Sequence, residues 1–323
     1  GIVTSVDILK NLLMNPGYLN NPVVQKNLDA IINKKMSELS IEVEYIVKSI
    51  EPMMHFFYSI TLSKNSIGKY VITYEKMSMK RAAFPKDSIM PIFEVYNGEV
   101  VSACEKENDE FIQQFLKVTT NLLSTNSMSA LFLEKMLMPE DDISEVVTGP
   151  FFAAMGQLLI FANKLYVCIE QSDDHRKHII NNAYDSVKNN EAEFSHLLKS
   201  MFNAGIINFD AMTGVQDIVP KENYSIYEKN VKKMCEFIRI FKTDLRRIEI
   251  ESKIDRNTYT CDLIMVYDSY KIHAEYESTG IKKMIRLYAY LKKMVEGEIV
   301  FIDEFDSNLH DVYLCALLEY LMD

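Results

Sequence analysis

The stretch from Tyr276 to Leu309 constrains the fold of this chain more than any other. Apolar residues recur at three- and four-residue spacing from Ile281 to Val295, which predicts a helix with one buried face. A turn at Gly297 follows, and Ile299–Ile302 is an unbroken apolar run, which predicts a strand covered on both faces. The chain is therefore expected to contain a helix that leads directly into a buried strand.

The two ends of this helix–strand unit carry residues that could bind a ligand or take part in catalysis. Ser278 can cap the helix, and Gly280 leaves the amides of its first turn open to a close approach by an anion. The strand ends in Asp303 and Glu304, of which the first can hold Mg²⁺ and the second can deprotonate a water. The simpler interpretation is that both carboxylates cap the turn into a helix that begins near Asn308.

Three segments together resemble a known family. They are Glu277-Ser-Thr-Gly280-Ile-Lys282, the strand that closes on Asp303-Glu304, and Asp306-Ser-Asn-Leu-His310. In this order and spacing they are similar to the second half of an ABC-type ATPase domain, and in particular to the OLD-like AAA ATPases of bacterial abortive-infection and phage-defence systems. The resemblance implies a mixed α/β (α+β) fold: an ABC-type P-loop NTPase-like core with an antiparallel β-subdomain and a large helical insertion.

The resemblance also implies a function and roles for the site residues. The protein is expected to bind and hydrolyse ATP with Mg²⁺, to form a homodimer through its nucleotide face, and to act in phage defence. Asp303 holds the metal in this scheme, and Glu304 activates the attacking water. Ser278 and Gly280 contact the γ-phosphate bound by the other subunit, and Asp306 lies along the dimer seam.

Two further expectations concern the geometry of this site. If the site forms across a dimer, the start of the Ser278 helix should lie well away from the end of the Ile299 strand within one subunit. Lys282 and Lys283, in the first turn of the helix, either add positive charge to the site or are simply solvated.

One feature of that family is missing from the sequence. A G-x-x-x-x-G-K-[ST] loop, which holds nucleotide phosphates, is absent, and the one Gly-Lys pair, Gly68-Lys69, is followed by Tyr70. The ATPase core is therefore expected to be truncated at both ends, just before Gly1 and after Asp323. Two functions remain as alternatives: an ATPase that works as a dimer, and a truncated or decayed non-catalytic relative that acts as a protein-interaction scaffold.

The rest of the chain divides by its periodicity. Residues 1–106 begin with a helix and continue from Ile41 to Val101 with a two-residue period and an Asn97-Gly98 turn, which predicts an antiparallel meander. Residues 107–243 are expected to form a helical insertion that an effector protein could contact, and residues 244–323 complete the core. The helices expected in the insertion are Asp109–Leu123, Ala130–Met138, Phe151–Glu170, Arg176–Asn189, Glu193–Asn203 and Tyr224–Phe241.

The composition of the chain indicates which binding partners and which cellular compartment to expect. With 46 acidic and 35 basic residues the formal net charge is −11, which argues against a generic polyanion binder but leaves a local nucleic-acid contact open. The five cysteines are scattered and odd in number, which favours the reducing cytoplasm over a disulfide framework or a zinc site. The most apolar run, Phe151–Ala162, is too short to cross a bilayer, so no membrane partner is expected. His175 and His178 lack further ligands and indicate an exposed helix start more than a metal site.

Overall fold

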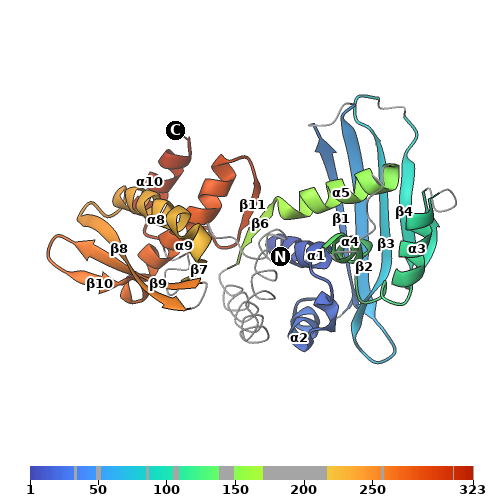
Figure 1. The fold of residues 1–323 in the computed structure, drawn as a ribbon, viewed down its shortest axis with the longest axis horizontal. Helices are drawn as coiled ribbons and strands as arrows, with labels where there is room; N and C mark the ends of the chain where they lie inside the picture. The colour runs from blue at the N-terminus through green and yellow to red at the C-terminus, as the bar shows by residue number, and fades with distance from the viewer. Residues whose placement is uncertain are drawn as a thin grey trace. The chain divides into compact units, whose positions relative to one another are not determined.

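The computed structural model describes residues 1–32, 35–48, 52–84, 87–104, 109–137, 149–169, 217–255, 258–307 and 309–322. The chain divides into two compact units, unit 1 (Gly1–Lys164) and unit 2 (Leu165–Asp323). Both units combine helices with mainly antiparallel strands (Figure 1), so the expected mixture of α and β structure is confirmed. The boundaries expected after residues 106 and 243 do not coincide with this division.

Unit 1 is built on a five-stranded antiparallel meander. Its strands, in sheet order, are β1 (Glu38–Val47), β2 (Met54–Lys64), β3 (Tyr70–Arg81), β4 (Met90–Tyr96) and β5 (Glu99–Ala103). In β2 every second side chain from Phe56 to Leu62 is buried, as the two-residue period predicts. Asn97 and Gly98 join β4 to β5 with φ values of 49° and 82°, the left-handed geometry that favours an Asn-Gly hairpin turn. The predicted meander and its turn are confirmed.

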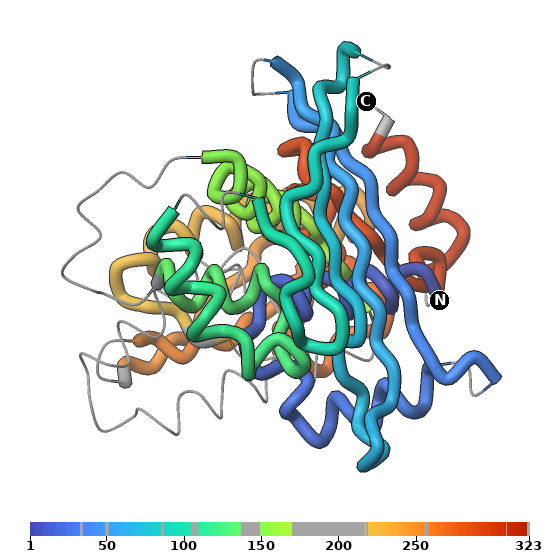
Figure 2. Tube along the Cα trace, turned by 90° about the vertical axis from the view of Figure 1, so that its right-hand side faces the viewer, coloured from blue at the N-terminus to red at the C-terminus, as the bar shows by residue number. Residues whose placement is uncertain are grey.

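Helices pack on the meander and close the core of unit 1 (Figure 2). They are α1 (Ile2–Met14), α2 (Pro22–Ile31), α3 (Glu110–Thr119), α4 (Met128–Leu137) and α5 (Pro150–Asn163). Helix α5 crosses the sheet, because its Phe161 stacks on Tyr45 of β1 while its Phe151 contacts Phe93 of β4. Phe151 also contacts the rings of Phe115 in α3 and Phe132 in α4. The expectation that α3–α5 belong to a separate insertion is wrong, because their apolar faces bury against this sheet.

Asp109 caps the first turn of α3. Its Oδ1 accepts a hydrogen bond from the Ile112 N–H at 3.1 Å. The substitution Asp109→Ala is expected to lower the free energy of unfolding of unit 1 by about 1 kcal/mol, the usual cost of losing an N-cap. Urea denaturation followed by circular dichroism measures this loss. The matched control is Asp109→Asn, which also caps; equal losses for the two variants would contradict the capping role.

Unit 2 combines an antiparallel sheet with a parallel strand pair. Strand β9 (Thr258–Tyr267) pairs antiparallel with β7 (Asp217–Pro220), β8 (Leu245–Asp255) and β10 (Lys271–His273). Strand β6 (Leu165–Cys168) pairs in parallel with β11 (Ile299–Ile302) along the whole length of both. The helices of unit 2 are α8 (Tyr224–Arg239), α9 (Thr279–Val295) and α10 (Asp311–Met322).

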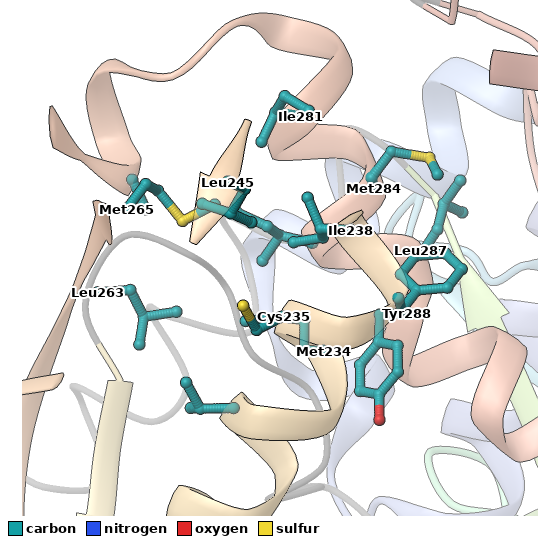
Figure 3. Close-up of a cluster of buried hydrophobic side chains, with 14 of the residues drawn as sticks. Met234, Cys235, Ile238, Leu245, Leu263, Met265, Ile281, Met284, Leu287 and Tyr288 are labelled. Atoms are coloured by element: carbon teal, nitrogen blue, oxygen red, sulfur yellow. The ribbon is translucent and has the colours of Figure 1, made fainter. Parts of the chain in front are cut away.

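The core of unit 2 lies where α8 and α9 pack against β8 and β9. Figure 3 shows side chains from these four elements pointing toward one another. Met234 of α8, Met265 of β9 and Met284 of α9 are all fully buried there. Flexible methionine side chains fill irregular spaces between helices and a twisted sheet.

The structure corrects several sequence predictions in and around unit 2. The helix predicted over Phe151–Glu170 ends at Asn163, and Leu165–Cys168 forms β6, because a short apolar run suits either a helix or a strand. Strands β6 and β7 both come from residues 107–243, so this range is not a purely helical insertion. The predicted helices over 176–189 and 193–203, together with His175 and His178, lie outside the described residues.

The predicted helix and strand form as α9 and β11, but the end of α9 and the whole of β11 are less buried than the sequence predicts. Val295, at the end of the predicted apolar stripe of α9, is 75% exposed. In β11 Ile299 is exposed and the next three residues are half-buried, so the strand is not covered on both faces within the described residues. Strand β11 also has a single strand neighbour, β6, in the described part of the chain.

Candidate functional site

The carboxyl ends of β6 and β11 lie side by side, as parallel pairing requires. The Asp303 N–H extends the pairing by donating to the Cys168 carbonyl at 2.9 Å. Asp303, Glu304 and Asp306 follow β11 and are exposed. Among the described residues, no hydrogen bond or ion pair engages any of these three carboxylates. Three carboxylates so close in sequence repel one another, and a cation that binds there relieves the repulsion.

The helix after this loop is capped by a different residue. Helix α10 begins at Asp311, and the His310 carbonyl accepts a hydrogen bond from the Leu314 N–H at 3.0 Å. The His310 Nδ1 accepts from the Val312 N–H at 3.4 Å. The interpretation that Asp303 and Glu304 cap the next helix is therefore wrong, and Asn308 lies outside the described residues.

The start of α9 presents open backbone amides. Ser278 is the N-cap, as predicted: its Oγ accepts from the Ile281 N–H at 3.3 Å, and its carbonyl accepts from the Lys282 N–H at 3.0 Å. Within the described part of the chain, the N–H groups of Thr279 and Gly280 have no hydrogen-bond partner. Open amides at the positive end of a helix dipole favour an anion.

Glu277, just before the N-cap, is held by a tyrosine from the sheet. Its Oε1 accepts a hydrogen bond from the Tyr267 hydroxyl at 2.5 Å, and its Oε2 accepts from the Ser278 N–H at 3.2 Å. Burial, followed by the bond to Glu277, raises the pKa of the Tyr267 phenol well above its ordinary value, so the hydroxyl remains a donor. No sequence pattern indicates Tyr267, because its contact with Glu277 depends on how β9 packs beside the start of α9.

Lys283 connects the start of α9 to the loop after β11. Its side chain is buried, and its Nζ donates to the Glu304 carbonyl at 2.5 Å and to the carbonyl and Oγ of Ser307, both at 2.6 Å. The interpretation that this lysine is solvated is wrong, because the loop folds back over its ammonium group. Lys282 instead lies at the surface and donates to the Glu275 carbonyl at 3.3 Å.

These contacts bear on how the site residues are assembled. One turn beyond Ser278, α9 touches the loop after β11 in the same chain, so the expectation that the two regions lie well apart is wrong at Lys283. In the described residues, no hydrogen bond joins Ser278 or Gly280 to Asp303 or Glu304. Their assembly across a dimer stays a prediction.

The donor set can be compared with the needs of a metal ion. No group of three or more His, Cys, Asp or Glu side chains in the described ranges could form a metal cage. Mg²⁺ does not require one, because it commonly uses one or two carboxylates together with substrate phosphates and waters. The Asp303 carboxylate, which is exposed and has no partner in the part of the chain that the structure describes, fits that requirement.

Comparison with known proteins adds no assignment: no family model matches the chain, and its sequence matches none of the curated proteins. None of the described helices is both long and apolar enough to cross a bilayer.

Proposed function

We propose that unit 2 is part of an ATP-binding, ATP-hydrolysing core of the ABC type, similar to the OLD-like AAA ATPases. The observation that carries the proposal is the position of Asp303 and Glu304 at the carboxyl end of β11 beside the parallel strand β6, where their carboxylates have no partner among the described residues. In sheets with parallel strands, ligands bind outside the carboxyl ends of the strands. The simpler explanation, that these two carboxylates cap the next helix, does not hold, because His310 caps α10.

The proposal gives each site residue a role. Asp303 holds Mg²⁺, which neutralises charge on the β- and γ-phosphates. Glu304 takes a proton from a water as the water oxygen bonds to the γ-phosphorus and the bond to the ADP oxygen breaks. The open amides after Ser278, including that of Gly280, bind the γ-phosphate of a nucleotide held by a second subunit, and Asp306 lies at the seam between subunits.

A non-catalytic scaffold is the second candidate function. It is favoured by one observation, the lack of a G-x-x-x-x-G-K-[ST] segment anywhere in the 323 residues. Contact with an effector protein, action in phage defence and a cytoplasmic location are proposals under either function.

Metal binding tests the proposal directly. Sub-stoichiometric Mn²⁺, used as a paramagnetic substitute for Mg²⁺, is expected to broaden the amide NMR signals of residues 303–306 selectively, and more strongly when ATP is present. Asp303→Asn should weaken this effect at least tenfold, because the only proposed protein ligand to the metal is lost. Glu251→Gln, which alters an exposed acid on β8, is the control.

Two results would count against the proposal. Equal broadening at other exposed carboxylates would show that the loop has no preference for a cation. Selective broadening that ATP does not enhance would favour the scaffold function over nucleotide binding.

A further inference from the structure

Lys283 is a buried lysine whose hydrogen-bonding capacity is fully used. Only 5% of the residue is exposed, and its Nζ donates to the Glu304 carbonyl, the Ser307 carbonyl and the Ser307 Oγ. An ammonium group has three donors, so these contacts satisfy it completely. Burying a charge is costly unless it is compensated in this way. An apolar side chain at this position of α9 would fill the space without any charge to compensate by hydrogen bonds.

The loop that Lys283 binds has an unusual backbone. Glu304 has a φ of 48°, in the left-handed region that costs a residue with a side chain about 1–2 kcal/mol. The Glu304 carbonyl accepts from the Ser307 N–H at 2.9 Å as well as from Lys283. These two bonds hold the turn closed at the residue where the backbone is strained. Such strain persists only where the surroundings determine the conformation.

The left-handed residue also decides where the carboxylates point. Residues 303–307 form turns between β11 and α10, and the side chains of Asp303 and Glu304 are exposed while the Glu304 carbonyl accepts from Lys283. A different conformation at Glu304 would redirect both the carbonyl and the carboxylate.

We propose that Lys283 is a positioning residue, whose ammonium group holds the loop after β11 so that the Asp303 and Glu304 carboxylates face a Mg²⁺-bound nucleotide. The function of this positioning rests on the proposed ATPase activity, but the positioning itself does not. Because Lys283 lies three residues after Gly280 on the same helix, it also makes the loop move with the start of α9. The two parts of the proposed site are thereby linked within one chain.

Hydrogen exchange of the full chain tests the positioning without any nucleotide. Lys283→Met keeps an unbranched side chain that is one atom shorter and removes the donors. The Ser307 amide, which is bonded to Glu304, is expected to exchange at least tenfold faster in this variant. The Asp303 amide, bonded to Cys168 in β6, should change little. Lys282→Met, at the neighbouring surface lysine, is the matched control and should leave both amides unchanged.

Two more variants cover the case in which Lys283→Met disturbs the whole of unit 2. Ser307→Ala removes one of the three acceptors and should accelerate exchange in the loop by a smaller factor, about two- to fivefold, with α9 intact. Glu304→Asn places a residue that tolerates a positive φ at the strained position, so Lys283→Met should accelerate exchange less in this background. An unchanged Ser307 amide in Lys283→Met and Ser307→Ala, or no relief by Glu304→Asn, would overturn the proposal.

Mn²⁺ broadening of the same variants separates this inference from the proposed function. If the loop loosens in Lys283→Met but the wild-type chain binds no metal with ATP, Lys283 positions the loop and the ATPase proposal fails. If the wild type binds Mn²⁺ with ATP and Lys283→Met exchanges and binds like the wild type, the ATPase proposal stands and the role of Lys283 is refuted.

Discussion

Raising the pH from 5 to 8 is expected to destabilise unit 1 by about 2–3 kcal/mol relative to the same unit with Glu75→Gln. Glu75 lies on β3 with no exposed surface. Its Oε1 accepts a hydrogen bond from the Tyr58 hydroxyl at 2.8 Å, and its Oε2 accepts from the Met128 N–H at the start of α4 at 2.9 Å. Burial raises the pKa of this carboxyl from 4.5 to about 7, and the two hydrogen bonds offset burial only in part.

The sign of the effect follows from the raised pKa. Below pH 4.5 Glu75 is protonated in both the folded and the unfolded chain and contributes no pH dependence. Between pH 4.5 and about 7 the unfolded chain releases the proton while the folded chain keeps it, so stability falls as the pH rises. Above pH 7 both states are ionised, and the loss is complete. Glutamine removes the titration, and it can still accept from the Met128 N–H while its NH₂ group donates to the Tyr58 oxygen.

The measurement is urea unfolding at pH 5, 6, 7 and 8, followed by NMR signals of unit 1 so that unit 2 does not contribute. Other titrating groups are common to both proteins and cancel in the difference. Glu42→Gln, at an exposed position on β1, is the matched control and should leave the pH dependence unchanged. Parallel stability curves for the wild type and Glu75→Gln would show that the carboxyl does not titrate in this range.

Phosphate release from Mg·ATP by the 323-residue chain alone is expected at the background rate. Phosphoryl transfer depends mainly on positioning and charge stabilisation of the phosphates, and this sequence has no G-x-x-x-x-G-K-[ST] loop to supply them. A general base acts only on a substrate that is already held in place. Turnover well above background by this chain, abolished in Glu304→Gln, would show that its phosphates are held elsewhere.

In a chain that carries such a loop joined before Gly1, Glu304→Gln is expected to reduce turnover by about 10²–10⁴-fold, the usual contribution of a general base. Binding of Mg²⁺ and ATP should survive this substitution, because the proposed metal ligand is Asp303. Steady-state phosphate release and Mn²⁺ broadening, measured on the same samples, separate the two steps. Glu251→Gln is again the control. Equal losses in binding and turnover would mean that Glu304 acts on ligand affinity, not on the chemical step.

Much of the local structure could be predicted from sequence, because it depends on neighbouring residues. The strand alternation in β2 follows from the two faces of a sheet, and the Asn97-Gly98 turn follows from the few residues that accept a positive φ. Ser278 was identified as a cap because its hydroxyl reaches an amide only three residues away. Where short-range geometry decides the outcome, a sequence pattern is sufficient.

The division of the chain was harder to predict. Apolar residues in α3–α5 show which face of each helix is buried but not which partner covers that face, and only the folded structure places the meander there. Leu165–Cys168 continues an apolar run, and its pairing with β11, far along the chain, makes it a strand. Contacts between distant segments have no local signature.

In the candidate site, too, the sequence predicts local features but not the contacts of single residues with distant segments. The sequence by itself determined that an acidic pair follows an apolar strand and that a capped helix with a glycine in its first turn precedes it, because residue type and spacing fix these features. Only the tertiary structure decided that Glu75 is buried, that His310 is the next helix cap, and that Lys283 turns inward to bind the loop at Glu304. The physical reason is that burial and hydrogen-bond partners of a charged side chain are set by the segments that pack around it, and those segments come from elsewhere in the chain.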